Sequence, residues 1–359
     1  PAAHNGLVAG SSPARPTTPD AHPQIDKPLR AAEYFPNTGA RTSRGETIML
    51  IRSLAGLFAL ALGVNAAFAA DEIKVAVGSG GNLESFIVEI GARGGLFEKH
   101  GIKPSVFYTA GGGETLQALL SNSAAIGVSI GSTGAFGAFA KGAPIKLIGA
   151  SSVGSPNYWY VPTQSPIKTI KDIAGRKLAY STAGSGTYAV AQLVRRSGVD
   201  ATLVATGNTP GTFTQVMTGQ VDVGFAYPEF KQDALAAGEI RILFRDNDFD
   251  HIRNQSIRII AMHASQSTEF GQRFMKAYVE SVDWIFSDDK AVGIYADLLK
   301  VDLALAKKLR DEFWNRQILS VDKVRGIDLI MADALEGKFL QSALTKEQIN
   351  EMIAPYARP

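Results

Sequence analysis

The stretch that decides the fold of this chain is KPSVFYTAGGGETLQALLSNSAAIGVSI, residues 103–130. A run rich in β-branched and aromatic residues comes first, a glycine-rich turn follows, and residues 114–122 then have the spacing of an amphipathic helix. A second apolar run, at 124–130, completes the unit. Two short buried strands connected by a helix are typical of a parallel sheet that helices cover on both faces.

The same alternation continues from residue 73 to residue 263. We predict strands at 73–78, 103–109, 124–130, 145–151, 158–162, 177–181, 201–206, 221–227, 240–244 and 256–263. We predict helices at 83–101, 114–122, 135–142, 167–175, 187–198, 213–220 and 229–238, then long amphipathic helices at 271–288, 291–300 and 303–315. LLSNSAAIGVSI (119–130) and VMTGQVDVGFAY (216–227) align without gaps at equivalent points, which predicts two similar α/β lobes.

The first 69 residues are not expected to belong to either lobe. Residues 1–48 hold 7 of the 16 prolines and no hydrophobic period, so we interpret them as a disordered leader upstream of the true start at Met49. Residues 49–69 combine Arg52, a short apolar run and the small residues of AFA, which is typical of a secretory signal peptide cleaved after Ala69. The apolar run is shorter than the roughly 20 residues of a membrane-spanning helix. We therefore expect a periplasmic protein.

The composition of residues 70–359 excludes several classes of function. They carry 30 basic and 30 acidic residues, and the absence of a basic surplus argues against a general nucleic-acid binder. The chain has no cysteine, hence no disulfide framework and no thiol chemistry. Two of its five histidines lie in the leader and no H-x-x-x-H pair occurs, so no metal is expected.

Four strand ends carry a glycine-rich loop that opens a helix: residues 77–85, 109–117, 181–189 and 206–214. Backbone amides at a helix N-terminus attract negative charge, and ligands of doubly wound sheets bind at the carboxyl ends of the strands. None of the loops has the Lys-Ser/Thr of a nucleotide-binding loop, so no cofactor is expected. The alternative, that the glycines serve only tight turns and helix caps, stays open, above all for 111–113.

A second function is compatible with one motif. GVSIG (127–131) has the form G-x-S-x-G between a strand and a helix, as in an exported serine hydrolase with Ser129 as nucleophile. Such an enzyme needs an acid, Asp248 or Asp250, and then a histidine, His251 or His263. No histidine follows residue 263 and no HGGG motif precedes Ser129, so this reading is the less favoured one.

Three segments resemble a known family: residues 96–132, SPIKTIKDIAGRKLAYSTAGSGTYAVAQL (165–193) and TGQVDVGFAYPEF (218–230). They are similar to periplasmic substrate-binding proteins of ABC importers, in the group that binds nitrate, sulfonates, taurine and thiamine-pyrimidine precursors. The resemblance spans about residues 73–350. It implies the type II periplasmic-binding-protein fold, with two doubly wound sheets joined by crossover strands near 158–164 and 252–258. Lobe one would be 73–160 plus 257–359, and lobe two 161–256.

The resemblance implies solute capture rather than catalysis, in a monomer that delivers its ligand to a membrane permease and its ATPase subunit. It predicts ligand contacts from lobe one at Ser79, Gly81, Asn82, Ser129, Ser132 and Thr133. It predicts contacts from lobe two at Ser185, Gly186, Thr187, Tyr188, Asn208, Tyr227 and Glu229, with Ser155 and Asn157 before the first crossing. For Tyr227, ordinary strand-end packing is the alternative.

The ligand class follows from the charge at Glu229. A carboxylate in the cleft repels an anion unless it is paired, for which Arg258 is a candidate, or it can accept a hydrogen bond from an amino group. We therefore expect a small organic anion or zwitterion, such as a sulfonate, a taurine-like compound or an aromatic or pyrimidine compound, rather than nitrate.

Overall fold

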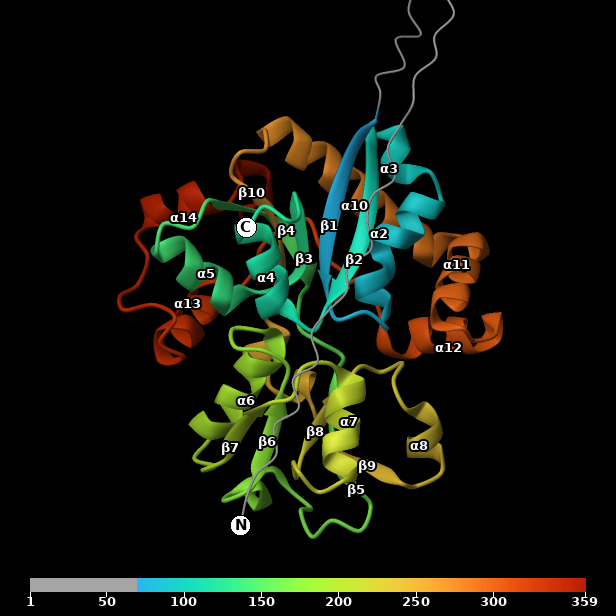
Figure 1. Ribbon diagram of the computed structural model, residues 1–359, viewed down its shortest axis with the longest axis vertical. Helices are drawn as coiled ribbons and strands as arrows, with labels where there is room; N and C mark the ends of the chain where they lie inside the picture. Colours follow the sequence, from blue (N-terminus) through green and yellow to red (C-terminus); the bar gives the residue numbers. More distant parts are fainter. Residues whose placement is uncertain (1–69) are drawn as a thin grey trace, which may run out of the picture. The chain divides into compact units, whose positions relative to one another are not determined.

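The computed structural model describes residues 70–359, so the predicted leader and signal peptide lie outside the described residues. The described residues form two lobes, each with its own strands, helices and hydrophobic core (Figure 1): lobe one has a five-stranded sheet, and lobe two has a three-stranded and a two-stranded sheet. In the part of the chain that is described, no helix is both long enough and apolar enough to cross a membrane.

The sheet of lobe one has five strands in the order β2-β1-β3-β10-β4. Its strands are β1 (Asp71–Gly78), β2 (Ile102–Thr109), β3 (Ile126–Gly131), β4 (Ile145–Ser152) and β10 (Arg258–His263). β1 is parallel to β2 and β3, whereas β10, which returns from lobe two, is antiparallel to β3 and β4. The helices between these strands are α2 (Leu83–Arg93), α3 (Leu96–Lys99), α4 (Gly112–Leu120) and α5 (Ser132–Ala140).

Lobe two repeats this order with shorter strands. They are β5 (Tyr158–Pro162), β6 (Lys177–Tyr180), β7 (Thr202–Ala205), β8 (Gly224–Ala226) and β9 (Ile240–Arg245). β8-β5-β9 and β6-β7 are joined only by a parallel bridge between Leu178 and Val223, which gives the order β7-β6-β8-β5-β9. β5 occupies the fourth position in this order, which is the position of β10 in lobe one.

The helices of lobe two are α6 (Gly186–Arg196), α7 (Thr209–Met217) and α8 (Gln232–Ala236), with the short turn η1 (Ile170–Ile173). η2 (Asp246–Asp248) and α9 (Asp250–Arg253) lie in the return to lobe one. α4 is followed by β3 and α7 by β8, and each of these strands is the third in the spatial order of its lobe. The aligned segments 119–130 and 216–227 therefore occupy equivalent positions in the two lobes.

The boundary between the lobes differs from the one predicted. We expected a crossing near 158–164 and lobe one to reach residue 160, but β5 pairs with β8 and β9 inside lobe two. The aromatic side chains of Tyr158, Trp159 and Tyr160 are buried in the core of that lobe, which holds the strand there. The connecting segments are therefore 153–157 and 246–257.

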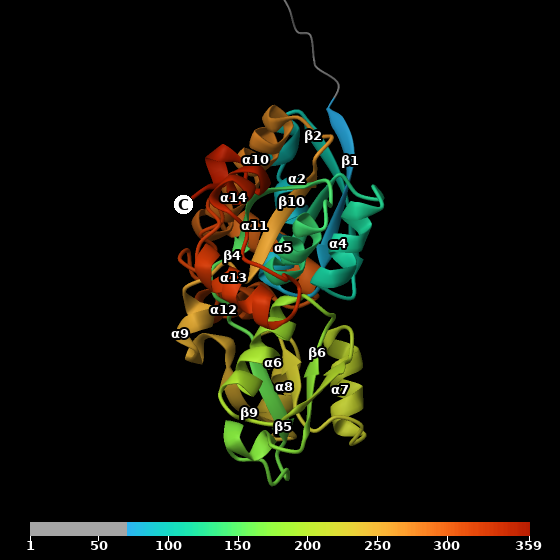
Figure 2. The same ribbon diagram turned by 90° about the vertical axis from the view of Figure 1, so that its left-hand side faces the viewer.

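Helical details also differ. The predicted helix 83–101 is divided into α2 and α3, because Gly95 has a φ of 73° that only glycine adopts easily. Five C-terminal helices pack on lobe one, as the turned view in Figure 2 shows. They are α10 (Thr268–Ser287), α11 (Asp289–Leu299), α12 (Leu303–Phe313), α13 (Ile327–Glu336) and α14 (Lys346–Met352), and the last two were not anticipated.

Candidate functional site between the lobes

The glycine loops of the two lobes touch each other directly. The amide of Gly113 donates to Thr182 Oγ1 at 3.0 Å, and Thr133 Oγ1 donates to the carbonyl oxygen of Gly184 at 3.4 Å. A Cβ on Gly131 would clash with that same carbonyl oxygen and lie 2.6 Å from the Cα of Ser185. The missing side chains thus let the backbones of the lobes meet, a role beyond that of tight turns.

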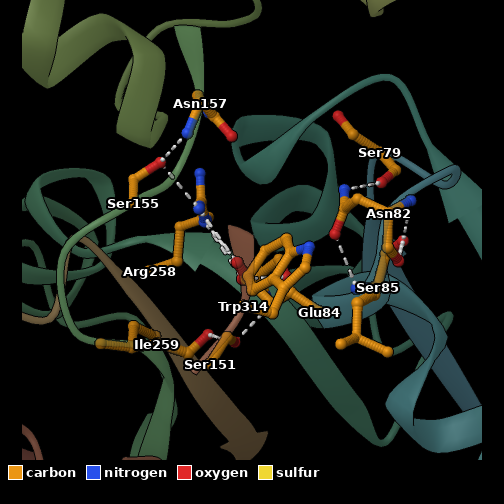
Figure 3. A network of polar contacts seen from close by, with 12 residues as sticks. Ser79, Asn82, Glu84, Ser85, Ser151, Ser155, Asn157, Arg258, Ile259 and Trp314 are labelled. Atoms are coloured by element: carbon orange, nitrogen blue, oxygen red, sulfur yellow. Dashed lines mark hydrogen bonds and ion pairs between the residues drawn. The ribbon is translucent and has the colours of Figure 1, made fainter. Parts of the chain in front are cut away.

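A buried ion pair between two elements of lobe one, α2 and β10, lies close to the start of α6 in lobe two (Figure 3). Arg258 Nε donates to both carboxylate oxygens of Glu84 at 3.0 Å, and its Nη2 lies 2.9 Å from Glu84 Oε2. Ser129 Oγ donates to Glu84 Oε1 at 2.8 Å, while Arg258 Nη2 also donates to Ser155 Oγ at 3.1 Å. The side chains of Arg258 and Glu84 are 10% and 3% exposed, so this charge pair is almost dry and strongly coupled.

The other end of the guanidinium faces lobe two. Arg258 Nη1 is 3.5 Å from where a Cβ on Gly186 would stand, and Gly186 is the first residue of α6. Ser185 caps this helix by accepting from the amide of Tyr188 at 3.1 Å. Because a helix N-terminus is electropositive, two positive groups from different parts of the molecule meet here, and an acidic ligand group would relieve their repulsion.

Tyr227 of lobe two and Ser79 of lobe one, both predicted to contact the ligand, lie next to each other across the lobes. Burial raises the pKa of the Tyr227 phenol to about 12, while a hydrogen bond with Ser79 and the charge of Arg258 act in the opposite direction. Tyr227 is therefore a neutral hydroxyl at physiological pH. Ser79 also donates to the carbonyl oxygen of Ala110 at 3.0 Å, and Asn82 caps α2 by accepting from the amide of Ser85 at 3.0 Å.

Unsatisfied polar atoms gather beside the crossing segments. Asn157 is fully buried, and neither its side-chain oxygen nor its nitrogen has a hydrogen-bond partner among the described residues. Its carbonyl oxygen accepts from the amide of Asp246 at 3.0 Å. Asp246 Oδ1 accepts from Trp159 Nε1 at 2.7 Å, whereas Oδ2 has no hydrogen-bond partner among residues 70–359. Burial raises the pKa of Asp246 to about 6, although hydrogen bonds and the charge of Arg258 act in the opposite direction. Buried polar atoms without partners are costly, and a ligand or a water can satisfy them.

The carboxylate of Glu229 is turned toward lobe one. Its Oε1 accepts from the Leu83 amide at 2.9 Å, from the Tyr295 hydroxyl at 2.8 Å and from Trp314 Nε1 at 2.6 Å. Burial raises the pKa of Glu229, and these hydrogen bonds partly counteract that effect. Arg258, the partner considered from the sequence, is instead paired with Glu84.

The remaining predicted residues are less central. Ser132 Oγ donates to the carbonyl oxygen of Ile257 at 3.2 Å, and Thr187 Oγ1 accepts from the Ser181 amide at 2.9 Å. Gly81 is exposed, and Asn208 is exposed at the N-terminus of α7, where it accepts from Gly211 at 2.9 Å.

Tyr188 lies at the edge of the contact between the lobes. Its ring meets the ring of Phe339 in lobe one at 5.6 Å between centroids. It lines a pocket of about 620 Å³ together with Arg195 and Lys338 rather than the space around Arg258.

The sequence alone did not point to Glu84, Asp246, Tyr295 or Trp314. Glu84 lies in the first turn of α2, where an acidic residue is an ordinary complement to the helix dipole. Tyr295 lies in α11 and Trp314 directly follows α12, 66 and 85 residues from Glu229, so only the fold shows that they meet it.

The geometry does not support the serine-hydrolase alternative. Ser129 Oγ donates to a carboxylate that is already paired with an arginine, and not to an imidazole. The histidines of residues 70–359 have other partners: His100 contacts Glu280, His251 contacts Asp333, and His263 contacts Ser265. The same residues contain no group of metal-ligating side chains.

Comparison with known families identifies the chain. The model of the family described as NMT1/THI5 like matches residues 84–291, more than half of the sequence. The chain belongs to the NMT1/THI5-like family. The resemblance inferred from the sequence is thereby confirmed. No curated relative matches the chain.

Solved structures with a similar fold have low sequence identity to this chain. The alkanesulfonate-binding protein SsuA from Xanthomonas axonopodis pv. citri bound to MOPS has 16% identity and a TM-score of 0.63, covering 80% of this chain and 98% of its own. The periplasmic aliphatic sulphonate binding protein SsuA from Escherichia coli has 19% identity and a TM-score of 0.60, covering 77% and 91%. The Candida albicans CA3427 gene product, described with the generic periplasmic binding protein fold, has 16% identity and a TM-score of 0.61, covering 80% and 97%.

These similarities confirm the predicted periplasmic-binding-protein fold. The two SsuA structures are named as sulfonate-binding proteins, and at 16% and 19% identity their likeness to this NMT1/THI5-like chain is a likeness of fold.

Proposed function

We propose that the protein is the solute-binding component of an ABC import system. It captures a small organic anion or zwitterion between its lobes, in the periplasm, and delivers it as a monomer to a membrane permease and its ATPase subunit. Sulfonates and taurine-like compounds come first among the candidates, followed by aromatic and pyrimidine compounds.

The observation that carries this proposal is the position of Arg258. Its guanidinium lies between the two lobes, bound on one side to Glu84 and facing the N-terminus of α6 on the other. An acidic head group placed there would contact a charged donor from β10 of lobe one and amides from lobe two at once. Such a ligand would bind both lobes, and the closed form would then be favoured by its presence.

Glu84 supports a ligand that carries an amino group as well. Because Glu84 already balances the charge of Arg258, a purely anionic ligand adds a negative charge close to that carboxylate. A zwitterion would place its acidic group near Arg258 and its amino group near Glu84 or the unsatisfied Asn157 side chain. The uptake of taurine-like compounds would fit this charge pattern.

A thermal-shift screen of the protein against sulfonates, taurine, aromatic acids and pyrimidines tests the proposal. A ligand present at 100 times its Kd stabilises the native state by about 2.7 kcal/mol through mass action. The double variant Arg258→Met with Glu84→Gln removes both charges together and leaves neither buried alone. We expect the variant to remain folded and to lose the ligand-induced shift.

Arg253→Met is the matched control, because Arg253 is an exposed arginine that pairs with Asp250 on the surface. It should keep the full shift. A compound that stabilises the double variant as much as the unchanged protein binds elsewhere, and would refute the placement at Arg258. A panel without any stabilising compound would refute the ligand class.

A further inference from the structure

Glu229 connects lobe two to three separate parts of lobe one. It follows β8 directly after Tyr227 and Pro228, and its donors are the first amide of α2, the Tyr295 hydroxyl of α11 and the Trp314 indole after α12. All three bonds end on one oxygen, Oε1, at 2.6–2.9 Å. One acceptor atom of lobe two thus gathers three elements that are distant in the sequence.

The three donors form a receptor for a carboxylate. Tyr295 and Trp314 are 0% and 1% exposed, so their polar hydrogens have no route to bulk water while the lobes are together. The Leu83 amide is at the N-terminus of α2, where the helix dipole favours a negative charge. Without Glu229 these donors would be buried and unpaired in the closed form, whereas opening would return them to water.

This geometry leaves Oε1 without capacity for a ligand. Its three donors come from the protein itself, and a ligand amino group would have to displace one of them. Oε2 is buried and has no partner among the described residues. The main interaction of Glu229 is therefore with lobe one, and this differs from the ligand contact that the sequence suggested.

We propose that Glu229 is a clasp that holds the two lobes together even when no solute is bound. It acts as a positioning residue: it sets the population of the closed form, and through it the affinity for the solute. Only the effect on affinity rests on the proposed function, because closure can be measured in the absence of any ligand.

The test uses the absence of cysteine from the chain. Ala236→Cys in α8 and Glu312→Cys in α12 introduce two exposed labelling sites, one on each lobe. The two helices lie on the same side of the molecule, to the right in Figure 1. Spin labels at these sites report the distance between the lobes in the full-length, ligand-free protein by double electron–electron resonance. We expect a predominant short distance, and at least a tenfold fall in the ratio of closed to open molecules for Glu229→Ala.

Two further variants separate the clasp from a general effect on folding. Glu229→Gln keeps an acceptor oxygen and should retain an intermediate closed population. The pair Tyr295→Phe and Trp314→Phe removes two donors from the lobe one side and should open the lobes as Glu229→Ala does. This second route keeps the test decisive if Glu229→Ala fails to fold by circular dichroism.

Asp233→Ala is the matched control, since Asp233 lies on the same lobe with a side chain that is 79% exposed. It should leave the distance distribution unchanged. A ligand-free protein that is already open, a Glu229→Ala distribution like that of the unchanged protein, or equal opening in Asp233→Ala would each overturn the clasp. A compound that still binds at Arg258 in those cases would leave the proposed function standing.

Discussion

Two buried carboxylates connect the lobes, one near α11 and α12 and the other at α13, on opposite sides in Figure 1. Glu229 belongs to lobe two and accepts from neutral donors of lobe one. Asp333 belongs to lobe one and pairs with Arg196 of α6, while His251 Nε2 at 2.7 Å and Gln255 Nε2 at 2.9 Å reach it from the crossing segment. Both carboxylates accept hydrogen bonds from several donors. The donors to Glu229 are neutral groups of the opposite lobe, whereas those to Asp333 include an arginine of the opposite lobe and two side chains of the connecting segment 246–257.

The contact at Asp333 supports the fold, whereas the contact at Glu229 supports closure of the lobes. Asp333 is bound to the segment that joins the lobes, so its bonds to His251 and Gln255 need not break when the lobes separate. Among residues 70–359, the side-chain hydrogen bonds of Glu229 all come from neutral donors of lobe one. Loss of Asp333 should therefore weaken the whole protein, and loss of Glu229 should chiefly change the distance between the lobes.

The largest effect is expected from Asp333→Ala. It leaves the Arg196 guanidinium, which is 20% exposed, with Glu336 as its remaining charged partner. It also removes the acceptor of His251 and Gln255, so we expect a loss of about 3 kcal/mol, at the low end of the cost of breaking a buried pair. Urea unfolding measures the free energy of unfolding. Glu229→Ala should lose much less in the same assay, and Asp328→Ala, an exposed acid of the same helix, should lose almost nothing. Equal losses for Asp333→Ala and Glu229→Ala would remove the distinction between the two carboxylates.

Asp246, in the connecting segment 246–257, is a third buried carboxylate that can be compared with Glu229 and Asp333. Burial raises its pKa from 3.8 to about 6, so the folded protein binds this proton more tightly than the unfolded chain does. Protonated Asp246 therefore stabilises the fold below about pH 4, and this contribution is lost as the pH rises to about 6. The free energy of unfolding falls by at most about 3 kcal/mol over this range.

Asp246→Asn keeps an acceptor for Trp159 and removes the titration. Relative to the unchanged protein, it should gain stability between pH 4 and pH 7 in urea unfolding experiments. Parallel pH profiles for the two proteins would show that Asp246 does not titrate as its burial implies.

The smallest effect on the fold, but a clear one on binding, is expected from Gly131→Ala. Gly131 has a φ of −64°, which alanine adopts without strain, yet its Cβ would meet the backbone of Gly184 and Ser185 across the lobes. The clasp at Glu229 and the bonds of Asp333 stay chemically intact while closure is obstructed. Overpacking of this kind costs about 1–3 kcal/mol, which corresponds to a loss of solute affinity of about fivefold to 150-fold.

Calorimetric titration with a solute found in the thermal-shift screen measures that loss. Gly293→Ala is the control, because a Cβ at Gly293 meets nothing within 4 Å. It should bind like the unchanged protein. Normal affinity in Gly131→Ala would mean that the glycine contact is not needed for capture.

Much of the secondary structure could be predicted because its signals are local. Apolar runs and helical periodicity located the strands and most helices, and the repeat of 119–130 at 216–227 indicated two similar lobes. The lobe to which YWYVP belongs could not be predicted in this way. An extended aromatic segment suits either sheet, and only the pairing with β8 and β9 and the burial of Trp159 decide it.

By itself, the sequence determined the alternation of strands and helices, the glycine loops at the strand ends and the family, since each depends on residues close together in the chain. The hydrogen-bond and ion-pair partners of the buried polar residues follow from the three-dimensional fold alone. Arg258 pairs with Glu84 across 174 positions, and Trp314 reaches Glu229 across 85. Hydrogen bonds and charge pairs act over a few ångströms in space, and a sequence without the fold does not state which distant residues come within that range.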